Sequence, residues 1–120
     1  MNAIANAVVV LVAALHVYFL VLEMFLWTKP LGLKTFRNSI EKATDSAVLA
    51  ANQGLYNGFL AAGLVWGLSQ SAPGFAFQIK MFFLLCVIVA GIYGAATVSR
   101  RILAVQAAPA ALALILLFLA

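Results

Sequence analysis

Two ionisable side chains stand out within long apolar stretches of the sequence. Glu23 is the only acidic residue in any of these stretches, and His16, the only histidine, lies seven residues before it. Seven residues make about two helical turns, so both side chains lie on one face of a helix. An ionisable side chain in an apolar helix is costly and commonly marks a site for protons, ions or substrate. Histidine also changes its charge near neutral pH.

Amide and phenol side chains accompany this pair in the other apolar stretches. They are Asn52, Gln53, Tyr56, Asn57, Tyr93 and Gln106. Counted at about 1.5 Å per residue from the basic ends of the stretches, Asn52 and Gln53 reach the depth of Glu23. By the same count Asn57 reaches the depth of His16. The pattern predicts a polar binding pocket in one half of a membrane, open toward the cytoplasm.

Two interpretations of this polar cluster remain open. In the first, the pocket binds a small molecule, and the protein is a proton-coupled carrier or a small-molecule binding protein. In the second, the polar groups join helices, each bond contributing about 0.6 kcal/mol, and the protein is structural or accessory. An enzyme is less favoured because the sequence has no H-E-x-x-H, no Gly-rich phosphate loop and no carboxylate pair. We expect no catalytic residue, no metal and no cofactor.

The composition indicates the kind of fold that must hold these polar side chains. Of 120 residues, 67% are hydrophobic and only 8% are charged, against about a quarter charged in soluble domains. About 20 apolar residues cross a bilayer as a helix, and lipid admits only helices or closed barrels. The sequence therefore predicts an all-α, integral membrane four-helix bundle in a single domain, residues 1–120. Its spans are expected at 3–27, 46–68, 75–99 and 102–119.

The connection between the first two spans has a pattern of its own. Leu33, Phe36 and Ile40 recur at helical spacing, with charged residues between them. This favours a short amphipathic helix on the membrane surface, and a solvated loop is the alternative.

The basic residues predict the orientation in the membrane. The first and third connections hold Lys29, Lys34, Arg37, Lys42, Arg100 and Arg101, and the opposite side holds only Lys80. The basic side of a membrane protein is usually cytoplasmic, so both termini are expected outside a bacterial inner membrane. We expect the lipid bilayer as partner and no nucleic acid.

Glycines at four-residue spacing indicate close helix packing. Gly54 with Gly58, and Gly63 with Gly67, form two G-x-x-x-G patterns. Such patterns let helix backbones approach each other, either within the chain or in a homodimer. A homodimer through one of these pairs is expected, because four short helices rarely enclose a path alone.

Two stretches carry a family resemblance. They run from Leu15 to Trp27, as LHVYFLVLEMFLW, and from Leu49 to Gly63, as LAANQGLYNGFLAAG. They resemble small bacterial integral membrane proteins catalogued as domain of unknown function 1304, over essentially the whole chain. The resemblance implies a four-span protein of the bacterial inner membrane. It implies no activity, so it assigns no functional residues.

Overall fold

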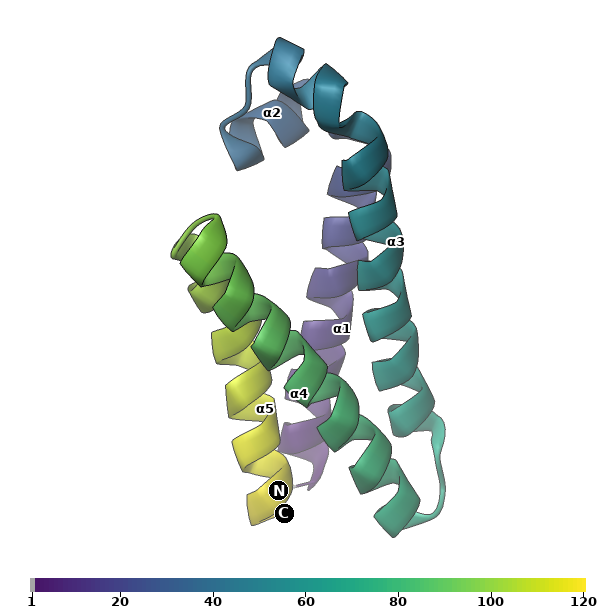
Figure 1. Cartoon of the computed structure of the whole chain (residues 1–120). Helices are drawn as coiled ribbons and strands as arrows, with labels where there is room; N and C mark the ends of the chain where they lie inside the picture. Colours follow the sequence, from purple (N-terminus) through teal and green to yellow (C-terminus); the bar gives the residue numbers. More distant parts are fainter. Residues whose placement is uncertain (1) are drawn as a thin grey trace. The chain divides into compact units, whose positions relative to one another are not determined.

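Long apolar runs, broken only at short polar connections, make most of the chain helical. The computed structural model describes residues 2–120, which form five α-helices and one π-helical turn and no strand (Figure 1). The elements are α1 (Asn2–Met24), α2 (Pro30–Phe36), α3 (Ile40–Ser69), α4 (Pro73–Thr97), η1 (Leu103–Ala107) and α5 (Ala108–Leu119). The predicted all-α class is therefore confirmed.

Two of the described helices are long and apolar enough to cross a membrane. They are Ala3–Met24 within α1 and Pro73–Thr97, which is α4. Leu103–Leu119 is apolar but shorter. α3 is longer than either, yet its amides and the charged residues of its first turns make it more polar. The four-span bundle stays a prediction.

The helices gather into two compact units. The central unit is His16–Phe59, and the terminal unit joins Met1–Leu15 with Leu60–Ala120. The central unit therefore contains α2 and the adjoining parts of α1 and α3. α4, η1 and α5 belong to the terminal unit. The single-domain prediction remains a prediction.

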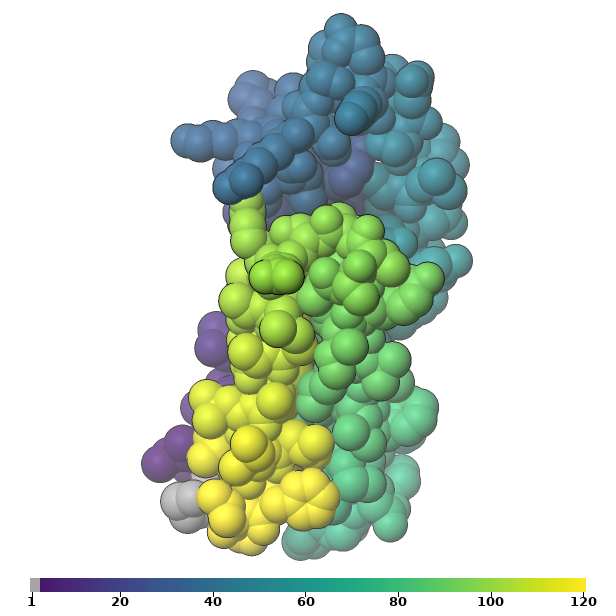
Figure 2. Space-filling model, turned by 60° about the vertical axis from the view of Figure 1, so that its left-hand side comes forward, coloured from purple at the N-terminus to yellow at the C-terminus, as the bar shows by residue number. Residues whose placement is uncertain are grey.

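The terminal unit is built around a core of small and branched apolar side chains. α4 and α5 run antiparallel and side by side, and their side chains meet along one face (Figures 1 and 2). Gly91 lets α4 lie close to the η1 backbone, since a Cβ atom there would lie 2.8 Å from the backbone nitrogen of Ala107. The core comprises Ala5, Val9, Val12, Ala13, Leu64, Leu84, Val87, Ala110, Ala113 and Leu117.

Pro109 explains the π-helical turn that precedes α5. Proline has no backbone N–H, and its ring collides with the carbonyl four residues before it in a regular helix. The chain responds by widening the turn, so that the Ala108 N–H donates to the Leu103 carbonyl, five residues back. π-Helical turns of this kind are rare and frequently occur at functional sites. This one contains Gln106.

α2 is the short helix expected between the first two predicted spans. Pro30 opens it, and it ends at Arg37, whose backbone is left-handed (φ 55°) and whose N–H donates to the Leu33 carbonyl. The Ser39 hydroxyl then accepts the Lys42 N–H at 3.2 Å and caps the start of α3. The predicted grouping of Ile40 with Leu33 and Phe36 in one helix was therefore wrong. The turn at Arg37 places Ile40 in α3 instead.

Candidate functional site

A carboxyl group and an amide meet in the central unit. The Asn57 side-chain nitrogen, on α3, donates a hydrogen bond to the Oε1 atom of Glu23, near the end of α1. Both side chains are half-buried. A carboxylate has about four acceptor positions, and this bond uses one of them. The pair therefore combines an oriented acid with acceptor positions for a proton or a polar ligand.

Glycines bring these two side chains within reach. A Cβ atom at Gly54 would lie 2.7 Å from Met24 Cγ and 3.1 Å from Glu23 Cβ, and one at Gly58 would lie 2.7 Å from Leu20. The α3 backbone therefore lies directly against α1, and the Asn57 side chain spans the short distance that remains. Of the two alternatives for the Gly54/Gly58 pair, the structure shows packing within the chain. A homodimer stays a prediction.

His16 lies on the buried side of the central unit. Its side chain has no exposed surface. Its ring packs edge-on against Phe19, with 5.2 Å between the ring centroids. Burial of an imidazole requires a polar partner, and His16 does have a further interaction. It contributes a fixed polar group on the same helix as Glu23.

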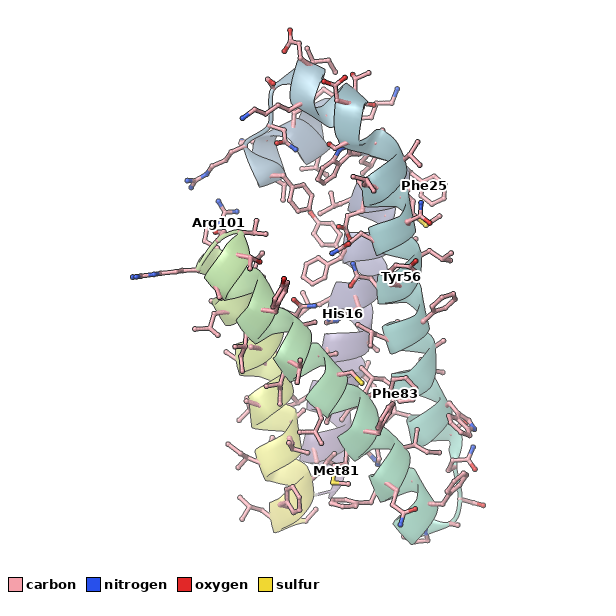
Figure 3. All side chains as sticks on the ribbon, viewed as in Figure 1. His16, Phe25, Tyr56, Met81, Phe83 and Arg101 are labelled. Atoms are coloured by element: carbon pink, nitrogen blue, oxygen red, sulfur yellow. The ribbon has the colours of Figure 1, made fainter. Side chains whose placement is uncertain are left out.

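The other candidates in the central unit face outward. Asn52, Gln53 and Tyr56 are exposed. The Asn52 amide donates to the Val48 carbonyl of its own helix at 2.9 Å. Tyr56, labelled in Figure 3, remains 57% exposed, and its ring centroid lies 6.1 Å from that of Phe59. The structure thus brings Asn57 to Glu23 and leaves these three side chains on the surface.

Tyr93 and Gln106 belong to the terminal unit. Tyr93 lies on α4 and is 71% exposed, whereas Gln106 is half-buried within η1 and has an interaction partner. Their membership of one pocket with Glu23 stays a prediction. Among residues 2–120, no three side chains of His, Cys, Asp or Glu gather as metal ligands.

A polar pair that the sequence did not reveal lies in the terminal unit. Lys80 is only 8% exposed, and its ammonium group donates to the Asn6 side-chain oxygen at 2.9 Å. Its aliphatic part crosses Gly67, where a Cβ atom would lie 2.7 Å from Lys80 Cγ. The sequence had indicated Lys80 only as a topological charge. The available signal was a lysine flanked by apolar residues, with an asparagine in another apolar stretch.

The terminal unit has no acidic side chain to neutralise Lys80. The chain has three acidic residues, Glu23, Glu41 and Asp45, and all three belong to the central unit. Within the terminal unit a neutral amide therefore accepts the hydrogen bond of a buried cation. Such a contact is sensitive to substitution because a buried charged donor that loses its acceptor has no replacement.

Together these features define an all-α protein with two helices able to cross a membrane and a carboxyl–amide pair between α1 and α3. The model of the family described as "Protein of unknown function (DUF1304)" matches residues 10–118. The chain belongs to this family. It is 32% identical over 107 residues, 88% of each chain, to the uncharacterized protein YpaA of Lactococcus lactis subsp. lactis. No solved structure shows significant similarity to it.

Proposed function

We propose that the protein is a four-span protein of the bacterial inner membrane, with both termini outside. The lengths and apolar composition of α1 and α4 support two of the spans. α3 and the continuous η1–α5 segment supply the other two. The clustering of Lys and Arg in the α1–α3 connection and in the α4–η1 turn supports a cytoplasmic location for these connections.

The proposed activity is binding of a small solute or a proton at Glu23, as part of a carrier or a binding protein. The hydrogen bond from Asn57 to Glu23 is the observation that carries this proposal. It orients an intramembrane carboxyl group, and such groups commonly mark ion and substrate pathways. Half-burial of Glu23 leaves the group reachable, and His16 adds a second ionisable side chain on α1.

A structural or accessory role is the second candidate. The same hydrogen bond joins α1 to α3 beside the close contact at Gly54. A polar bond between tightly packed helices also stabilises a membrane protein, without any ligand. The two roles differ in what the carboxyl group supplies. Binding requires its charge or its proton, whereas helix association requires only an acceptor oxygen.

Replacing Glu23 with glutamine separates these roles. Glutamine keeps an acceptor oxygen for Asn57 but can neither ionise nor take up a proton. We expect Glu23→Gln to abolish retention of any small molecule and to change the free energy of unfolding by less than about 1 kcal/mol. Native mass spectrometry of protein released gently from its own membrane measures retained mass and oligomeric state together. Thermal unfolding in detergent measures stability.

Glu41→Gln is the matched control, because it makes the same chemical change at an exposed position in the first turn of α3. A bound mass lost in Glu23→Gln and kept in Glu41→Gln supports the binding role. A natural chain without bound mass, or equal retention in both variants, contradicts binding of a small solute at Glu23. A clear loss of stability in Glu23→Gln alone favours the structural role. The spectrum of the natural chain also tests the predicted homodimer.

A further inference from the structure

The segment around α2 carries an exposed group of cations. Lys29, Lys34, Arg37 and Lys42 are all exposed, and Glu41 is the only acidic residue from position 29 to position 42. We call these four cations the basic platform. In Figure 2, side chains of this blue-coloured segment project from the surface. The local excess of positive charge attracts anions from solution or from a surface.

Exposed apolar side chains alternate with these cations. Leu31 is 47% exposed and Ile40 is 48% exposed. Leu31 and Lys34 are three residues apart in α2, so they share one face of the helix. Cations beside exposed leucine and isoleucine suit the boundary between lipid headgroups and acyl chains, where one part of the surface is charged and the next is apolar. A nucleic acid would match the cations but not these apolar neighbours.

The other side of α2 is held firmly in the central unit. Gly32 is buried against the backbone of Leu26 and Trp27. The Trp27 ring packs on Phe36 with 4.8 Å between centroids, and its indole N–H donates to the Ser46 hydroxyl at 3.1 Å. The platform is therefore presented by a folded surface, and binding does not require it to order first.

From this arrangement we propose that the basic platform binds the headgroups of anionic phospholipids. Charge complementarity selects anionic over zwitterionic headgroups, and Leu31 and Ile40 enter the adjoining acyl region. The inference rests on the proposed membrane location but is independent of the Glu23–Asn57 site. Each Lys or Arg near an anionic bilayer raises affinity about fivefold. Removal of two of these cations should therefore lower the preference about 25-fold.

Competition between two lipids tests the proposal. The full-length protein in detergent is mixed with equal amounts of phosphatidylglycerol and phosphatidylcholine with identical acyl chains. Native mass spectrometry then counts the bound lipids. The natural chain is expected to retain mostly phosphatidylglycerol, and Lys34→Gln/Arg37→Gln is expected to lower the ratio of phosphatidylglycerol to phosphatidylcholine about 25-fold. Lys34→Arg keeps the charge and should keep the preference. Leu31→Asn should reduce retention of both lipids.

Arg100→Gln/Arg101→Gln is the control, since it removes two cations at the α4–η1 turn and leaves the platform intact. It should change the ratio less than about twofold. Equal retention of the two lipids by the natural chain overturns the proposal. So does an equal loss of preference in the control, which would show a general charge effect. Thermal unfolding checks that each variant is folded, and Glu23→Gln with an unchanged lipid ratio separates this site from the proposed function.

Discussion

Replacing Gly91 with alanine is expected to lower the free energy of unfolding by about 2 kcal/mol. The added Cβ atom would lie 2.8 Å from the Ala107 nitrogen and 3.1 Å from its Cα atom. Because these are backbone atoms, no side-chain rotation relieves the overlap, and α4 must move away from η1. Alanine favours a helix over glycine by about 1 kcal/mol, which offsets only part of this cost.

Gly74→Ala provides the matched control. It makes the same change in the first turn of α4, where nothing lies within 4 Å of the added Cβ atom. Stability there should rise by up to about 1 kcal/mol, from helix propensity alone. Chemical unfolding of the purified protein in detergent measures both variants. If Gly91→Ala were as stable as Gly74→Ala, the close approach of α4 to Ala107 would be wrong.

Asn6→Leu is the second substitution with a large expected effect, a loss of about 2 kcal/mol. Leucine removes the acceptor for the partly buried Lys80 ammonium group, which then keeps its desolvation cost without its hydrogen bond. Lys80→Met should cost less than Asn6→Leu, because it keeps the long side chain that crosses Gly67 and leaves a neutral amide, not a charged group, without its partner. Unfolding in detergent measures both.

The double variant Asn6→Leu/Lys80→Met gives the decisive comparison. With both polar partners replaced by apolar groups, the stability should return close to that of the natural chain. Recovery would show that the cost of Asn6→Leu comes from the unpaired ammonium group. If the loss of stability in the double variant instead equals the sum of the losses in the two single variants, the two residues act independently.

Comparison of Gly74 with Gly91 shows that composition alone does not predict which glycine lies at a close helix contact. Both glycines belong to α4, and no feature of the sequence indicates which of them packs against another element. The difference arises because η1 passes beside Gly91, whereas no atom of the described residues lies within 4 Å of a Cβ atom at Gly74. Likewise, the Lys80–Asn6 bond joins residues 74 positions apart, so neither local spacing nor periodicity indicates it.

The two asparagines of α3 show how rotation selects the site. At about 100° per residue, Asn57 lies about 60° around the helix from Gly54, whereas Asn52 lies about 160° away. Gly54 faces α1, so Asn57 reaches Glu23 and Asn52 turns outward. Depth along the helix, which places Asn52 level with Glu23, was a poorer guide than this rotation.

The sequence by itself determined the all-α class, the family and a short helix between the first two predicted spans, because apolar run length and local turn residues govern these features. It also identified Glu23 as an acid in an apolar helix. Only the tertiary structure decided that Asn57 is its partner, that Lys80 is buried and that Ile40 belongs to α3. The first two outcomes depend on which helix faces touch, and glycines permit those contacts, because a Cβ atom at Gly54 or Gly67 would lie 2.7 Å from a side chain of the neighbouring helix. The third depends on the left-handed turn at Arg37.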